Sequence, residues 1–176
     1  MTKTLFLTIS LAAIFVASMI MVPAFAGGHL TIEEAEVEKD KGKWEVEIET
    51  SADIPTDGSS GAFGYGVIGK KAILVATTHG GVGPDHPDQA GQGDPVMHTH
   101  VVTLGPNAGC PDNLAVASIT SPSFSIEIDN DELEIEGVPT SAAGKLTQTT
   151  ASFTLSILGP ANAPTAVCVN DLQVFS

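Results

Sequence analysis

A repeated alternation of apolar and polar residues constrains the fold of this chain more than any other feature. Residues 34–38 and 44–49 place an apolar side chain at every second position, mostly between glutamates, and Asp40-Lys41-Gly42 interrupts the pattern between the two runs. The same alternation returns at residues 124–128, 133–135 and 153–157. Because successive side chains of a strand point to opposite faces, a period of two predicts strands with one wet face. We therefore expect a sheet protein, and no segment after residue 26 has the period of an amphipathic helix.

Other segments are apolar or rich in glycine at every position. Residues 62–69, 72–79 and 96–104 form this group and are predicted to be central strands, and residues 167–175 are predicted to be a closing strand. Together with the alternating segments they make about nine or ten strands, punctuated by Gly, Pro, Asn and Asp. We predict an all-β fold, a single-domain antiparallel β-sandwich or barrel that occupies residues 27–176.

The first 26 residues have the order of a secretory signal. Residues 5–22 carry no charge, follow Lys3, and lead to Ala24-Phe25-Ala26, which resembles a signal-peptidase site. We predict a signal-peptide helix over residues 1–26. The apolar run is close to the length that spans a bilayer, so an uncleaved membrane anchor is the alternative. Either outcome places the domain outside the cytoplasm, as a secreted or pseudoperiplasmic protein.

The charge balance excludes several partners. The chain has 21 acidic residues against seven lysines, no arginine, and a net charge of −14. Such a surface repels nucleic acid and lacks the bidentate clamps that arginine offers to phosphates. The string Gly64-Tyr65-Gly66-Val67-Ile68-Gly69 matches a dinucleotide-binding pattern, but no strand precedes it and no helix follows, so we expect no nucleotide. The acidity itself indicates solubility or salty surroundings, with a cationic partner as the alternative.

Two cysteines, Cys110 and Cys168, are the only ones in the chain. In an oxidising compartment two lone cysteines usually pair, so we predict a disulfide between them. Closing a loop of 58 residues would stabilise the fold by about 4 kcal/mol in the loop-entropy model. Thiolate metal ligation is the rival interpretation, although neither cysteine has a histidine or a second cysteine nearby. That isolation also excludes a blue-copper site.

Histidines gather around one long connection. His79, His86, His98 and His100 fall within 22 positions, on either side of or inside residues 80–95, a segment rich in Gly and Pro. Residues two apart in a strand share a face, so the His98 and His100 side chains start about 6.5–7 Å apart and can reach one ion. If the flanking strands pair antiparallel, His79 falls at the same end. The sequence therefore predicts a three-histidine copper or zinc site.

The fourth ligand and the alternatives come from the connection itself. Asp85, Asp94 and His86 are candidates for completing the coordination, with water as the other option. A calcium site built from Asp85, Asp88 and Asp94 is a second interpretation, but their spacing does not match an EF-hand or a repeat-type calcium motif. The third interpretation has no metal at all, and His98 and His100 are then hydrogen-bonded residues of a half-buried strand.

A separate copper site is predicted at the new amino terminus that cleavage after Ala26 would create. Gly27-Gly28-His29 would then offer a terminal amine, two amide nitrogens and an imidazole in one plane. Four nitrogens in a plane suit Cu(II) or Ni(II). Without cleavage the terminal amine does not exist and this site is lost.

Two resemblances bear on function. His98-Thr99-His100, followed by Gly109-Cys110 and later by Cys168, is locally similar to copper/zinc superoxide dismutases, but the further metal ligands of that family have no counterpart after Cys110. Taken whole, the chain resembles a group of small exported proteins of ammonia-oxidising archaea. The segments that carry this likeness are residues 4–26, 28–30, 54–58, 61–66, 77–81, 94–95, 98–100 and 167–169. This likeness implies a compartment outside the membrane and, by association, a copper-rich physiology.

These features lead to one hypothesis and one competitor. We expect an exported protein that binds a transition metal, copper before zinc, and serves metal handling or a metal-assisted reaction at the cell surface. The competitor is a structural or interaction module of the cell envelope, with envelope proteins as partners and no catalytic role. A metal-dependent hydrolase would need an essential carboxylate such as Asp94 as well, and no residue pattern identifies a substrate.

Overall fold

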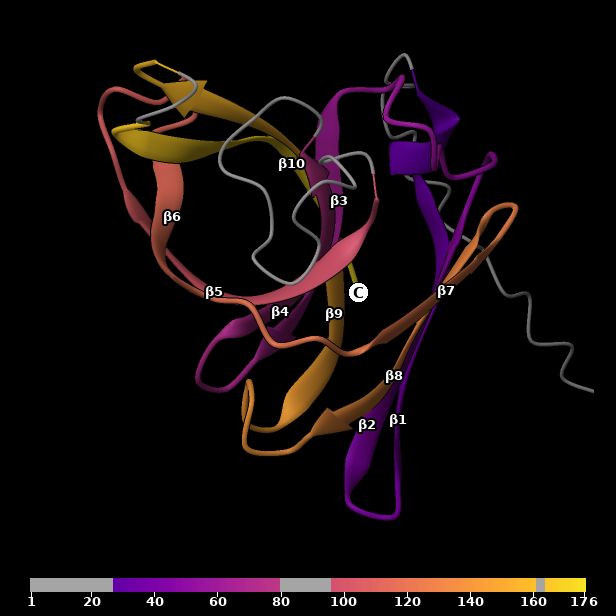
Figure 1. The fold of residues 1–176 in the computed structure, drawn as a ribbon. Coiled ribbons are helices and arrows are strands. Elements are labelled where there is room, and N and C mark those ends of the chain that lie inside the picture. Colours follow the sequence, from indigo (N-terminus) through magenta and orange to yellow (C-terminus); the bar gives the residue numbers. More distant parts are fainter. Residues whose placement is uncertain (1–26, 80–95, 161–163) are drawn as a thin grey trace, which may run out of the picture.

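Ten antiparallel strands form two units, a four-stranded sheet and a closed six-stranded barrel, which lie side by side (Figure 1). The computed structural model describes residues 27–79, 96–160 and 164–176. The predicted all-β fold of about nine or ten strands is confirmed. The predicted signal segment, residues 1–26, lies outside the described residues. Among the residues that are described, no helix has the length and apolar character needed to cross a membrane.

The four-stranded sheet is built from two hairpins. Its strand order is β1-β2-β8-β7, where β1 is Ile32–Asp40, β2 is Lys43–Thr50, β7 is Ser125–Asp129 and β8 is Glu132–Pro139. A short 3-10 turn, Gly28–Leu30, precedes β1. The β1–β2 turn has positive φ at both Lys41 and Gly42, at 45° and 87°, as the tight turn of a two-residue hairpin requires. This unit contains the predicted alternating strands of residues 34–49 and 124–135.

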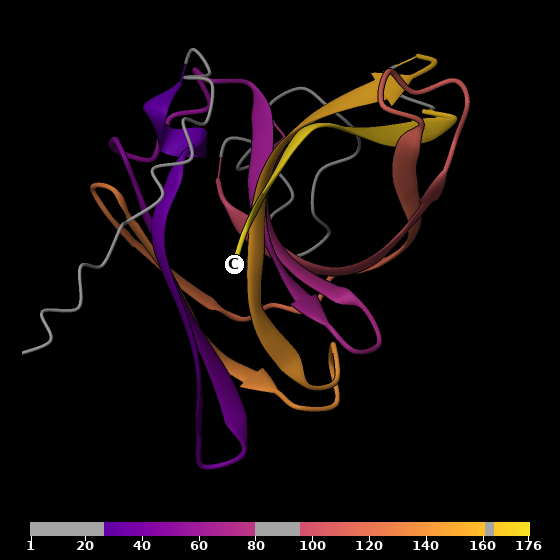
Figure 2. The ribbon, with the colours of Figure 1, turned by 180° about the vertical axis from the view of Figure 1, so that it is seen from behind.

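The six-stranded barrel contains the predicted central strands. Its order is β10-β6-β5-β4-β3-β9, and β9 closes back onto β10. The bounds are β3 Ala62–Gly69, β4 Ile73–His79, β5 His98–Pro106, β6 Leu114–Thr120, β9 Leu146–Leu158 and β10 Ala166–Phe175. Figure 2 shows the barrel and the sheet from behind, with β9 and β10 running along the barrel wall. All neighbouring strands of the barrel are antiparallel.

A single buried layer joins the two units. One face of β1, β2 and β8 supplies side chains such as Val46, Ile48 and Leu133, and the outer face of the barrel supplies Phe63 and Tyr65. Glutamates occupy the intervening positions of β1, β2 and β8. Alternate residues of β3, β4 and β5 point to this layer and to the barrel interior. Both faces of these strands are therefore enclosed, which explains why their sequences are apolar or glycine-rich throughout.

Strands β6 and β10 share fewer paired residues than any other neighbouring strands of the barrel, and we call their boundary the barrel seam. These strands pair at Cys168 and Ala115 alone, whereas β10 pairs with β9 along most of its length. The Cys110–Cys168 disulfide lies at this point, and both sulfur-bearing residues are buried. The backbone amide of Asp171 also donates to the Asp112 carboxylate at 2.8 Å across the seam. The predicted disulfide is thus present, and it ties the connection before β6 to β10.

One strand was not predicted, and another begins well before its predicted start. The sequence pattern did not predict β6 at residues 114–120. Thr103 pairs with Ser118 and Leu104 with Val116, so a bulge at Ala117 interrupts the alternation of this strand. Strand β9 begins at Leu146, seven residues before the predicted run at residues 153–157. Its first half is rich in threonine and hides few apolar side chains, so the hydrophobic pattern alone does not reveal it.

Candidate metal centre

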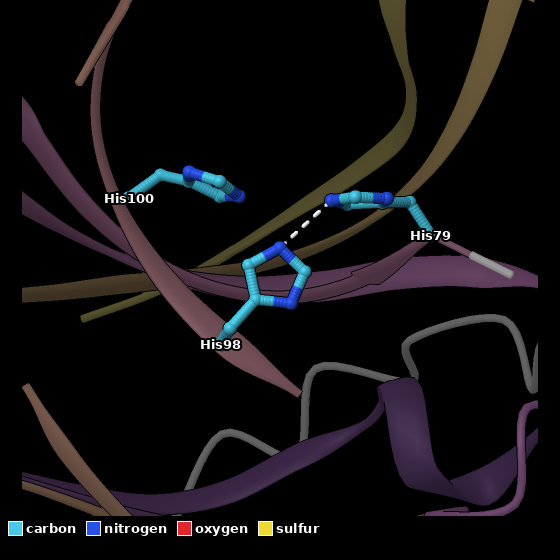
Figure 3. Close-up of side chains that lie close together, drawn as sticks. All are labelled: His79, His98 and His100. Carbon is cyan, nitrogen blue, oxygen red and sulfur yellow. Dashed lines mark hydrogen bonds between the residues drawn. The ribbon is translucent and has the colours of Figure 1, made fainter. Parts of the chain in front are cut away.

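Three histidines meet at one end of the β4–β5 pair. His79 is the last residue of β4, and His98 is the first residue of β5. In the antiparallel register, Thr77 lies opposite His98 and Val75 lies opposite His100. One potential ligand atom from each of His79, His98 and His100 lies within 4.8 Å of the others (Figure 3). We call these residues the three-histidine cluster, and the predicted convergence of their rings is present in the structure.

The rings face one another closely. The Nε2 atoms of His79 and His98 are 2.8 Å apart, and the ring centroids of this pair are 4.5 Å apart. The ring of His100 lies 4.7 Å from that of His98 and 5.9 Å from that of His79, centroid to centroid. Figure 3 shows all three rings directed toward a common region. Nitrogen atoms from two strands therefore surround a single point.

Backbone and side-chain oxygens orient two of the rings. His98 Nδ1 lies 2.9 Å from the carbonyl oxygen of Val96, which can only accept a hydrogen bond. His98 Nδ1 is therefore the donor, and in the neutral ring Nε2 keeps its lone pair. In that neutral form of His98, His79 Nε2 donates the hydrogen bond to His98 Nε2. Such an arrangement of an Nδ1 donor and an Nε2 lone pair is typical of metal-binding histidines.

The ring of His100 is oriented by a hydroxyl group next to the end of β6. Its Nδ1 lies 2.9 Å from the hydroxyl of Ser121, which follows β6. With the hydroxyl as acceptor, His100 also presents Nε2 as a lone pair. Sequence reasoning did not find Ser121, because only the pairing of β5 with β6 brings it beside His100. The carbonyl of Val96 was missed as well, since no side-chain pattern marks it.

Burial makes the cluster a solvent-poor environment. His98 and His100 are each 6% exposed, and His79 is partly buried. Within the described residues, this is the one group of three or more His, Cys, Asp or Glu side chains close enough to hold a metal ion. The other candidate ligands from the connection, Asp85, His86 and Asp94, lie outside the described residues, as does Asp88 of the calcium alternative.

His29 does not belong to the three-histidine cluster. It lies in the 3-10 turn before β1, and its ring contacts the edge of Phe63 at a centroid distance of 4.8 Å. Its backbone carbonyl accepts a hydrogen bond from the Tyr65 hydroxyl. Desolvation lowers the pKa of the His29 imidazole below its usual value. The ring also lies over Gly27, since a Cβ at that position would come within 2.6 Å of it.

The cluster borders a cavity inside the barrel. This cavity has a volume of about 440 Å³, and His79 and His100 line it together with Thr77 and Ser121. The remaining wall is almost wholly apolar, with Val75 and Phe153 among its members. A search of family models, curated proteins and solved structures finds no match to this chain.

Proposed function

We propose that this chain is an exported transition-metal-binding protein that holds copper, in preference to zinc, at His79, His98 and His100. The observation that carries the proposal is the convergence of three imidazoles from two neighbouring strands, with ligand atoms within 4.8 Å. Three histidines with a fourth position left for water or substrate are a known catalytic zinc arrangement, and imidazole also suits copper. Copper is favoured because it binds nitrogen ligands more tightly than zinc does.

The spacing of the nitrogens supports a shared ion. Metal–nitrogen bonds of about 2.0–2.1 Å in a tetrahedral site place ligand nitrogens about 3.3 Å from one another. His79 Nε2 and His98 Nε2 are 2.8 Å apart, and the largest separation in the cluster is 4.8 Å. Small side-chain rotations, which separate the first pair and draw in His100, reach that geometry. Metal binding would also replace the proton that His79 shares with His98.

We further propose that the protein acts outside the cytoplasmic membrane. The disulfide between Cys110 and Cys168 supports this, because such bonds persist in oxidising compartments. The signal-like order of residues 1–26 points the same way. Cleavage after Ala26 would add a second, amino-terminal copper site at Gly27-Gly28-His29, distinct from the three-histidine cluster.

Metal analysis of the purified chain tests the proposal. The His29→Ala variant is used as the background, so that the amino-terminal site cannot form. We expect about one equivalent of copper per chain, and at least a hundredfold loss of affinity when His98→Ala is added. Ser121→Ala should weaken binding about 10-fold, because it removes a group that orients a ligand.

The outcomes separate the two function classes. Copper retained by the His98→Ala, His100→Ala double variant would contradict the cluster as the site. A chain that binds neither copper nor zinc, and whose melting temperature is unchanged by either ion, would favour the structural module of the cell envelope. Binding of zinc in preference to copper would keep the site and correct the metal.

A further inference from the structure

We propose that the interior of the six-stranded barrel is a binding site for a small, uncharged, mainly apolar molecule that carries one polar group. The proposal concerns the cavity of the metal-free chain, so it does not depend on the proposed metal site. Its failure is therefore distinguishable from failure of the proposed metal site.

The cavity has the size and walls of a ligand site. Its volume of about 440 Å³ lies within the range of roughly 300–1,000 Å³ that small-molecule pockets occupy. Small residues make the room, since Gly66 pairs with Ala151 across β3 and β9 and both line the cavity. Protein interiors are normally packed to high density, so apolar walls around an open volume lack contacts that an apolar ligand would supply.

The cavity has an apolar rim at the barrel seam. Ile119 of β6 is 55% exposed, and Leu172 and Val174 of β10 are 43% and 63% exposed. These are three of the four exposed large hydrophobic residues in the described chain, and all three line the cavity. A bulge between Asn170 and Gln173 turns Leu172 and Val174 to the same side as Val169. Clustered exposed apolar side chains mark binding sites on soluble proteins.

One end of the cavity is polar and explains the single polar group of the ligand. Thr77 lines the cavity, is 3% exposed, and its Oγ1 is buried without a hydrogen-bond partner among the described residues, so a rotation about χ1 would present this hydroxyl to a ligand. A buried hydroxyl without a partner is costly, so a ligand that hydrogen-bonds to it gains affinity. Thr77 lies opposite His98 in the register, and His79 and His100 line the same end.

The charge of the walls indicates a neutral ligand. Among the described lining residues there is no lysine, aspartate or glutamate, and the chain contains no arginine. A charged group moved into such an environment would lose its hydration without gaining an opposite charge. The favoured ligand is therefore an alcohol or a similar uncharged amphiphile rather than a carboxylate.

A fluorescence titration of the full chain, treated with a chelator to remove metal, tests the proposal. The probe is the neutral dye N-phenyl-1-naphthylamine, and 1-decanol and decanoate are the competitors. We expect saturable binding of one dye per chain, displaced by 1-decanol at least 10-fold more effectively than by decanoate. The absence of saturable binding, or equal competition by the alcohol and the carboxylate, would overturn the proposal.

Variants locate the dye. Ala151→Phe fills the cavity and should weaken dye binding at least 10-fold, and Val116→Phe provides a second filling at a partly exposed position should the first variant fail to fold. At the rim, the Leu172→Ser, Val174→Ser double variant should weaken binding several-fold. The matched control is Val96→Ser, because Val96 is the fourth exposed hydrophobic residue and does not line the cavity. Dye binding that survives both filling variants would place it elsewhere and overturn the proposal.

The polar end has its own variant. Thr77→Val keeps the shape of the side chain but removes the hydroxyl. The affinity for 1-decanol should fall about threefold or more, while the affinity for undecane, which has the same number of heavy atoms and no hydrogen-bonding group, should remain. An unchanged preference for the alcohol would contradict the role of Thr77.

Discussion

The four-stranded sheet and the barrel each have one face that packs in the shared buried layer and one face that does not. These second faces, the outer face of the sheet and the interior of the barrel, differ in character. The sheet turns ladders of glutamates to solvent, whereas the barrel encloses an apolar cavity with three histidines at one end. The outer face of the sheet is charged and exposed to solvent. The interior of the barrel is mainly apolar, so an apolar ligand can displace water from it. The glutamate ladders and the candidate metal and ligand sites therefore belong to different units of the described chain.

Like charges meet directly across the sheet. Glu47 pairs with Glu36 on one side and with Glu134 on the other, and Glu134 also pairs with Glu127. A hydrogen bond with Glu38, together with repulsion from Glu38 and Glu47, raises the pKa of Glu36. Partial desolvation and neighbouring carboxylates raise the pKa values of Glu49 and Glu134. The sheet therefore gains its stability from its buried face and loses some of it on the exposed one.

The largest expected effect comes from removing the disulfide, which belongs to the barrel alone. The Cys110→Ser, Cys168→Ser double variant should lose about 4 kcal/mol of unfolding free energy, because the loop of 58 residues is no longer constrained in the unfolded chain. Denaturant unfolding measures the loss. Hydrogen exchange should show the backbone amides of β6 and β10 less protected, and those of β1 and β2 little changed. Equal loss of protection in both units would contradict the assignment of the disulfide to the barrel seam.

A matched pair of valines compares the shared layer with the cavity wall. Val46 is 1% exposed between the two units, and Val75 is 4% exposed and lines the cavity. Val46→Ala should cost about 2–3 kcal/mol, since it removes two methyl groups and leaves a void. Val75→Ala should cost about 1 kcal/mol, because that side chain already borders open space. Equal costs from thermal or denaturant unfolding would argue that the cavity is filled by the protein itself.

The sheet should respond to pH and salt. Because the pKa values of Glu36, Glu49 and Glu134 are raised in the folded protein, the folded chain binds more protons than the unfolded chain above about pH 4.5. The stability contributed by these groups therefore falls as the pH rises from 4.5 through the raised values. Added salt should reduce this fall by screening. Melting temperatures of the wild type and the triple Glu→Gln variant across this range measure the effect, and identical slopes would refute it.

The smallest effect is expected from one substitution at the centre of a ladder. Glu47→Gln removes both like-charge pairs that Glu47 makes, with Glu36 and with Glu134, without changing the shape of the side chain. The melting temperature should rise by about 1–3 °C. Asp53→Asn is the control, because Asp53 is exposed, carries the same charge and lies outside the strands. A larger rise in the control would show that net charge, not the ladder, sets the effect.

Much of the sheet and the barrel could be predicted because burial shapes the hydrophobic pattern. A strand buried on one face has alternating apolar residues, and a strand buried on both faces has a continuous apolar run. The glutamate alternation located β1, β2, β7 and β8, and the unbroken apolar runs located β3, β4 and β5. Strand β6 and the first half of β9 were not predicted, because a bulge in β6 and a run of threonines in β9 interrupt the hydrophobic pattern. The disulfide could be predicted because only two cysteines were present.

The candidate site also has a part that could be predicted from the sequence and a part that could not. The convergence of His79, His98 and His100 could be predicted, because strand periodicity and hairpin pairing alone bring the three together. The hydrogen bond of Ser121 to His100 depends on the pairing of a strand that was not recognised. The cavity was also missed, because inward apolar residues have the same sequence pattern whether they fill a core or surround an open volume.

Electron paramagnetic resonance of the copper-loaded His29→Ala variant tests the central claim most directly. The couplings of Cu(II) to histidine nitrogens count the imidazoles bound to it, and we predict three, falling to two in His100→Ala. A spectrum without imidazole couplings, or one that is unchanged when His79, His98 and His100 are all replaced by alanine, would contradict the account.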